Sequence, residues 1–157
     1  MVALGAARIP QTRRATLPGM TATTSTAITS TAAVDGFLAD VLRGSMSPVH
    51  YARGAVLDAV VPGWRFAAEG PDAMAEEYGR WFRHPARFED LRRLPTPTGE
   101  IVEYTLSWTE DRVAHAGRHV HVIDLDDAGR IASDHVWCGG RWPADLLAQM
   151  VQARHVH

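Results

Sequence analysis

The sequence predicts an α+β domain in which helices come first and an antiparallel sheet follows. Residues 34–42 carry an amphipathic helical pattern, and Pro71 and Asp72 open a second helical stretch. From residue 101 to 138 the chain alternates apolar and polar side chains, with short turns between the runs. Helices on one side of such an antiparallel meander make an α+β domain.

The composition is that of one ordinary globular domain. The chain has 157 residues, of which 46% are hydrophobic and 22% are charged. A net charge of -2 predicts neither nucleic acid nor an anionic membrane as a partner. Because Cys138 is the single cysteine, no disulfide can form within the chain, and we expect a cytoplasmic protein.

The chain divides into an N-terminal tail, residues 1–32, and a domain, residues 33–157. Thr, Ala and Ser dominate residues 21–32 without apolar periodicity, so we expect a disordered tail. The preceding arginines suggest a targeting peptide, but no apolar core of about 7–15 residues follows them. Met20 is an alternative start of the chain.

The first half of the domain contains two helices and a hairpin. The first helix ends at Gly44, and its apolar stripe recurs at helical spacing: Val34, Phe37, Leu38, Val41 and Leu42. A short helical turn at 47–51 and a hairpin of strands 55–61 and 64–68 follow. The second helix stops before His84-Pro85, because a residue preceding proline tends to leave helical space.

The second half is a meander closed by a helix. Strands are expected at 88–94, 101–108, 112–125 and 130–138, with a hairpin tip at Glu110-Asp111 and a turn at 126–129. The last segment, 143–154, predicts a helix whose apolar residues face inward: Leu146, Leu147, Met150 and Val151.

Strand alternation groups the chemically active side chains. Since successive side chains point to opposite faces, three histidines share a face with Ile123 and Leu125: His115, His119 and His121. On the following strand, one face carries Ile131, Ser133, His135 and Trp137, and the other carries Ala132, Asp134, Val136 and Cys138. An inward His121 is either an acid/base group in a cavity or a histidine satisfied by a core neighbour.

Metal binding is the less favoured interpretation of the histidines. A strand rise of about 3.3 Å per residue puts His115 roughly 20 Å from His121, so only His119 and His121 could share one ion. We expect neither a metal nor a cofactor.

Two carboxylates interrupt apolar strands, Asp58 and Asp134. A buried carboxylate is costly unless paired, and one paired with histidine is a candidate general base. Parity alone leaves the face of each open. Four aromatic residues on the predicted strands line either a ligand cavity or the core: Trp64, Tyr104, Trp108 and Trp137. Cys138 has no activating pattern around it.

The chain resembles the nuclear transport factor 2-like superfamily from about Val34 to Gly140. The resemblance is carried by residues 51–58, by Gly70-Pro71-Asp72-Ala73-Met74 opening a helix, and by Val120–Leu125 followed by Gly129-Arg130-Ile131. This superfamily includes SnoaL-like polyketide cyclases and ketosteroid isomerases. The resemblance implies a cystatin-like α+β barrel, a curved antiparallel sheet wrapped round N-terminal helices to form a conical pocket.

The same resemblance implies roles for particular residues. His121 stands where the isomerases have an oxyanion-hole acid, and the isomerase base falls near Asp58 or Ala59. The implied pocket wall includes strand 102–108 and Asp134, Val136 and Cys138. The isomerases use a tyrosine on the first helix, and the matching position here is Phe37, which argues against steroid isomerisation by that machinery.

The sequence therefore predicts a cofactor-free cyclase, isomerase or dehydratase acting on a small apolar or polycyclic substrate, in secondary metabolism. His121 is the expected acid or oxyanion donor, and either Asp58 or Asp134 the base. The expected substrate contacts are Trp64, Tyr104, Trp108, Ile123 and Val136. The alternative is a non-catalytic binding or assembly domain on the same fold. A homodimer through the outer sheet face, where His135 and Trp137 would lie, is also expected.

Overall fold

A computed structural model describes residues 32–153, and the tail expected at residues 1–32 lies outside them apart from Ala32. In chain order, the elements are α1 Ala32–Arg43, the 3-10 helix η1 Pro48–His50, β1 Tyr51–Val61, β2 Trp64–Glu69, α2 Pro71–Trp81, β3 Ala86–Pro95, β4 Gly99–Glu110, β5 Val113–Leu125, β6 Ile131–Cys138, β7 Trp142–Pro143 and α3 Ala144–Ala153. The order of helices and strands agrees with the sequence prediction apart from the two-residue strand β7, which was not predicted.

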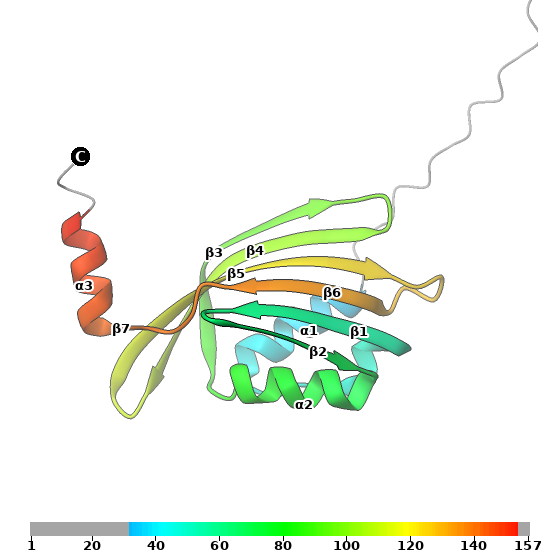
Figure 1. The fold of residues 1–157 in the computed structure, drawn as a ribbon, viewed down its shortest axis with the longest axis horizontal. Helices are drawn as coiled ribbons and strands as arrows, with labels where there is room; N and C mark the ends of the chain where they lie inside the picture. Colours follow the sequence, from blue (N-terminus) through cyan, green and yellow to red (C-terminus); the bar gives the residue numbers. More distant parts are fainter. Residues whose placement is uncertain (1–31, 154–157) are drawn as a thin grey trace, which may run out of the picture.

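The strands form one curved, unclosed sheet in the order β2-β1-β6-β5-β4-β3, and β7 pairs with β5. Helices α1 and α2 lie together on one side of it (Figure 1). The predicted α+β class, with a sheet curved round N-terminal helices, is confirmed. One pairing was not anticipated: β1 runs parallel to β6, so the sheet is mixed.

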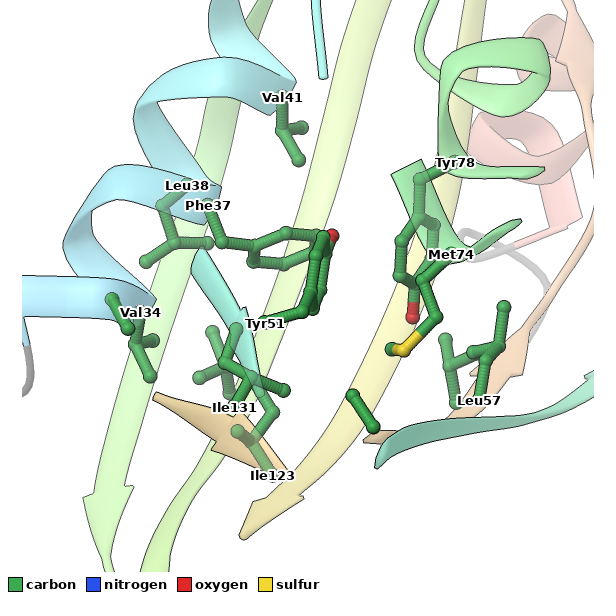
Figure 2. Packing of buried hydrophobic residues seen from close by; sticks show 14 of the residues in the cluster. Val34, Phe37, Leu38, Val41, Tyr51, Leu57, Met74, Tyr78, Ile123 and Ile131 are labelled. Carbon is green, nitrogen blue, oxygen red and sulfur yellow. The ribbon is translucent and has the colours of Figure 1, made fainter. Parts of the chain in front are cut away.

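Apolar side chains from α1, α2 and the inner sheet face fill the space between helices and sheet. Figure 2 shows Phe37 of α1 pointing toward Tyr78 and Met74 of α2. The Phe37 and Tyr78 rings lie 5.3 Å apart, and the Tyr78 ring stacks on Phe82 at 5.7 Å. Much of the conical space that the fold encloses is therefore packed core, since each of these side chains is at least 97% buried.

A bulge in β6 corrects the expected face of one residue. Asp124 pairs with Ser133, and Leu125 with Ile131, so Ala132 is an extra residue on β6. The bulge reverses the alternation, and Ile131 is buried on the same side as Asp134. The prediction that Ile131 faces with Ser133, His135 and Trp137 was therefore wrong.

The last helix does not contribute to the core as predicted. No residue of α3 is buried, and Val151 is 59% exposed. Figure 1 shows α3 standing beyond the end of the sheet, where it follows β7. None of the helices within residues 32–153 has the length and apolar character needed to span a membrane.

Candidate functional site

A hydrogen-bonded chain of four fully buried polar side chains crosses the inside of the sheet. The Tyr78 hydroxyl donates to Asp134 Oδ2 at 2.5 Å, and His121 Nδ1 lies 2.9 Å from the same oxygen. On the other side of the imidazole, Nε2 lies 2.9 Å from the Tyr104 hydroxyl. All four side chains are completely buried. We call this set, Tyr78, Asp134, His121 and Tyr104, the buried network.

Strand register and parity bring these side chains together. On β5 and β6, His121 pairs with Val136 and Ile123 with Asp134, so the imidazole and the carboxylate are diagonal neighbours on one face. Tyr104 lies on β4 two residues beyond Val102, the direct partner of His121. Tyr78 reaches the sheet from α2, whose buried face it shares with Met74.

The hydrogen bonds allow the network to exist in two protonation states. Burial, followed by the nearby charge of Asp134, raises the pKa of Tyr78 and of Tyr104 well above 10, so both phenols keep their protons. When neutral, His121 donates from Nδ1 to Asp134 and accepts from Tyr104 at Nε2. When protonated, the same imidazole donates to both, and the Tyr104 hydroxyl rotates to accept. One proton can thus be taken up or released without moving the rings.

A cavity of about 400 Å³ opens at the end of α2, beside the network. It is large enough for a small organic ligand, although it lies near the lower limit for such sites. Its wall is mainly apolar and aromatic, with two arginines and two titratable groups: Val61, Pro62, Arg80, Trp81, Phe82, Leu106, Trp108, His119, Cys138, Gly140 and Arg141.

One layer of side chains separates the cavity from the buried network. Phe82 lines the cavity, and its ring stacks on Tyr78 at 5.7 Å. His119 also lines the cavity, and its ring lies 5.1 Å from Tyr104 and 6.2 Å from His121. No member of the network lines the cavity itself. Trp81 lines the cavity as well, and its ring lies 5.6 Å from that of Tyr78. Trp81, Phe82 and His119 are therefore the side chains that connect the cavity to the network.

His119 is held in its neutral form. Burial, followed by the neighbouring charge of His121, lowers the pKa of His119 from its ordinary 6.5 to about 3. Its Nδ1 is enclosed and has no hydrogen-bond partner. At neutral pH the ring can donate or accept a hydrogen bond, but it carries no charge.

Of the two candidate carboxylates, only Asp134 lies beside His121. Asp58 follows Leu57 and precedes Ala59, which are both fully buried, so its side chain lies on the outer face of the sheet. There Asp58 accepts from Arg65 at 2.9 and 2.7 Å. Those hydrogen bonds lower the pKa of Asp58.

The five expected substrate contacts have different surroundings. Trp108 lines the cavity, whereas Tyr104, Ile123 and Val136 are fully buried behind it. Trp64 is 71% exposed, but it pairs with the cavity residue Val61 across the β1–β2 turn.

Sequence reasoning missed the parts that α2 supplies. The spacing of Met74, Tyr78 and Trp81 in the sequence puts them on one face of a helix, but it gives no sign that Tyr78 contacts Asp134, 56 residues later. Phe82 lies just beyond the periodic pattern. His119 was weighed only as a metal ligand, although its parity with His121 indicated the same inner face. Across residues 32–153, no group of three or more His, Cys, Asp or Glu side chains could hold a metal ion.

Comparisons with known proteins identify the fold. No protein-family model and no curated protein sequence matches the chain. Among solved structures, it is similar to the epoxide hydrolase/cyclase-like enzyme SalBIII, which has a role in pyran ring formation in the polyether salinomycin. That match has 19% identity and a TM-score of 0.53, and covers 68% of this chain and 88% of the other.

Two further structures agree. An LEH-like epoxide hydrolase from M. tuberculosis matches at 19% identity and a TM-score of 0.53, covering 68% of this chain and 79% of the other. An uncharacterized protein with a cystatin-like fold from Silicibacter pomeroyi DSS-3 matches at 16% identity and a TM-score of 0.52, covering 78% and 84%. At these identities the likeness concerns the fold alone: the chain has a cystatin-like fold, as the resemblance in the sequence implied.

Proposed function

We propose that the protein is a cofactor-independent enzyme that acts on a small, flat, apolar molecule by acid/base chemistry, as cyclases, isomerases and dehydratases do. One observation carries the proposal. A buried carboxylate–imidazole pair, Asp134 and His121, lies one side-chain layer from an apolar cavity. Paired titratable groups beside a cavity are typical of acid/base sites.

The elementary step would be proton removal from a carbon next to a carbonyl group. His121, backed by Asp134, accepts the proton at Nε2 once the Tyr104 hydroxyl turns away. The electron pair of the C–H bond then forms a C=C bond, and the carbonyl π electrons move to oxygen, giving an enolate. Return of a proton to either end of the enolate yields the isomerised or exchanged product.

The step requires the layer between cavity and network to open. Phe82 is the element that would move, because it follows the last residue of α2 and lies between the cavity and Tyr78. Displacement of its ring would join the cavity to the buried network.

Non-catalytic binding is the second candidate function. The observation in its favour is that Asp134 and His121 are completely buried and already hydrogen-bonded, as in a purely structural network. In that case the cavity binds a ligand and the network only stabilises the fold.

Exchange of carbon-bound hydrogen distinguishes the two without knowledge of the natural substrate. The probe is 2-acetylnaphthalene, a flat bicyclic ketone, and proton NMR in D₂O follows loss of its methyl signal. We expect the protein to accelerate exchange over buffer. Asp134→Asn should remove about 10²–10⁴-fold of that acceleration, the usual contribution of a positioned acid or base. Asp58→Asn is the matched control and should leave the rate unchanged, because Asp58 lies on the outer face.

Binding of the probe is measured in parallel through alkylation of Cys138, the only cysteine of the chain and part of the cavity wall. If the ketone protects Cys138 but exchange proceeds at the buffer rate, the catalytic proposal falls and the binding function stands. An equal loss of rate in both aspartate variants would also contradict the assignment of Asp134.

We further propose a cytoplasmic homodimer joined through the outer face of the sheet. Trp137 on β6 is 49% exposed there, and Val56 on β1 is 41% exposed. Large exposed apolar side chains that share a sheet face are typical of protein–protein contacts.

A further inference from the structure

Among the described residues that line the cavity, His119 is the one with a buried polar side-chain atom that makes no hydrogen bond. The side chain is 5% exposed, and Nδ1 is completely enclosed without a hydrogen bond. Nε2 also has no hydrogen-bond partner among residues 32–153. Buried polar groups are nearly always paired, and leaving one unpaired costs free energy. Because Nδ1 is enclosed, Nε2 is the atom of this ring whose unused hydrogen-bonding capacity a ligand in the cavity can meet.

The surroundings of the ring determine which hydrogen bond it can offer. An enclosed N–H without an acceptor is rarer in proteins than an acceptor without a donor, so the proton belongs on Nε2 and the lone pair on Nδ1. Since Nδ1 is enclosed, Nε2 is the nitrogen that can meet a ligand. His119 then acts as a neutral donor, and its low pKa keeps it uncharged throughout the physiological range.

The remaining polar groups of the wall favour a neutral ligand. Arg80 is paired with Glu76 and with Glu77, and Arg141 with Glu110. Each cavity arginine therefore has a carboxylate partner, which weakens its attraction for an anion. The Cys138 thiol has a pKa raised by burial and accepts from the Gly140 amide at 3.3 Å, so at neutral pH it is mainly the uncharged thiol and gives the wall little negative charge.

Aromatic rings supply the rest of the wall next to His119. The rings of Trp81 and Phe82 lie 6.5 and 5.4 Å from the His119 ring, and Trp108 lines the same cavity. Faces and edges of this kind suit a flat aromatic molecule.

We infer that the cavity selects a flat, neutral aromatic ketone whose carbonyl oxygen accepts a hydrogen bond from Nε2–H of His119. The inference rests on the proposed function, because it concerns the same cavity. His119 has a role that neither Asp134 nor His121 fulfils. It holds the carbonyl oxygen of the ketone, so that the carbon atom next to the carbonyl group faces the layer of side chains in front of the buried network. In an enolisation, this hydrogen bond would strengthen as charge develops on the oxygen.

The test compares three probes of one shape on the full-length protein: 2-acetylnaphthalene, 2-ethylnaphthalene and 2-naphthoate. Dissociation constants are measured by calorimetry, and protection of Cys138 from alkylation locates each probe in the cavity. His119→Phe should reduce the preference for the ketone over the ethyl compound by about 3- to 10-fold, the usual worth of one hydrogen bond. His119→Gln should keep most of the preference, because its amide N–H can occupy the position of Nε2–H. His135→Phe, on the exposed outer face, is the matched control and should change nothing.

The outcomes separate this inference from the proposed function. If the ketone-to-ethyl preference is the same in the wild type and in His119→Phe, the role of His119 is refuted while binding in the cavity stands. Tighter binding of 2-naphthoate than of the ketone would refute the selection of a neutral ligand. If no probe protects Cys138 at millimolar concentration, the inference and the proposed binding site both fall. Circular dichroism verifies that each variant is folded. If His119→Phe does not fold, His119→Leu, which also removes the N–H donor, replaces it and should show the same loss of preference.

Discussion

Acid should destabilise this protein through His119, by an amount that follows from its burial. In the unfolded chain the imidazole titrates near its ordinary pKa of 6.5, whereas in the folded protein the pKa of His119 is about 3. Above pH 6.5 the ring is neutral in both states and has no effect on stability. As the pH falls below 6.5, only the unfolded state gains the proton, so the free energy of unfolding decreases until about pH 3.

The magnitude at pH 5 depends almost entirely on the unfolded state. Protonation at 1.5 pH units below the unfolded pKa stabilises that state by about 2 kcal/mol. The folded state gains almost nothing at this pH, because the folded pKa lies well below 5. His119 should therefore lower the free energy of unfolding by about 2 kcal/mol between pH 8 and pH 5.

Urea denaturation of the wild type and of His119→Gln at pH 8, 7, 6 and 5 measures this contribution. The difference between the two free energies of unfolding should shift by about 2 kcal/mol over this range in favour of the glutamine variant. The other titratable groups near the ring are common to both proteins and cancel: His121, Tyr104, Cys138, Arg80 and Arg141. If the free energy of unfolding changes with pH in the same way in both proteins, the burial of an uncharged His119 is refuted.

Three further predictions follow from packing and exposure. Tyr104→Phe should cost about 1–3 kcal/mol in urea denaturation, because buried His121 Nε2 loses its hydrogen-bond partner while Nδ1 keeps Asp134; an unchanged midpoint would contradict the network. Trp137→Glu should convert a homodimer to monomers in sedimentation velocity at micromolar concentration, and a wild type that is already monomeric would refute the proposed assembly. Gly99→Ala should lower the melting temperature, because its Cβ would overlap the Ile123 carbonyl, while Gly54→Ala, where the space is open, should have little effect.

Much of the fold could be predicted because local patterns specify it. Helical spacing identified α1 and α2, and alternation placed His121 and Ile123 on the inner face of β5. Burial of one face of a helix or strand requires apolar residues at regular spacing, and this spacing can be read directly from the sequence. The resemblance to the nuclear transport factor 2-like superfamily then supplied the curvature that alternation does not encode.

The failed predictions involve contacts between distant residues or a break in periodicity. Ile131 was assigned to the outer face because strict alternation cannot anticipate the extra residue Ala132. The parallel pairing of β1 with β6 joins strands separated by about half the domain, and no local pattern specifies it. The apolar stripe of α3 predicted burial, but a stripe does not identify a partner. In the described part of the chain Leu146, Leu147 and Met150 are only half-buried, and Val151 is exposed.

In the candidate site, too, local patterns predicted some features, whereas contacts between distant residues could not be predicted. Parity placed His121 on the apolar face of its strand, and the family resemblance placed Asp134 in the pocket wall. Neither could show that Tyr78, Phe37 and Phe82 would pack around them and close the space. Whether an inward polar residue borders a cavity or a packed core depends on the volumes of side chains from other elements. For Asp58, the burial of Leu57 and Ala59 on either side decides the outward direction, and their apolar character was visible in the sequence.

The most direct test of the account is a crystal structure of the protein with bound 2-acetylnaphthalene. We expect the naphthalene rings to lie against Trp81, Phe82 and Trp108, with the carbonyl oxygen about 2.7–3.2 Å from His119 Nε2. We also expect a displaced Phe82 ring and the methyl carbon directed toward His121. A ketone found only outside the cavity, or inside it with no contact to His119, would contradict the central claim that this cavity and the buried network form one site.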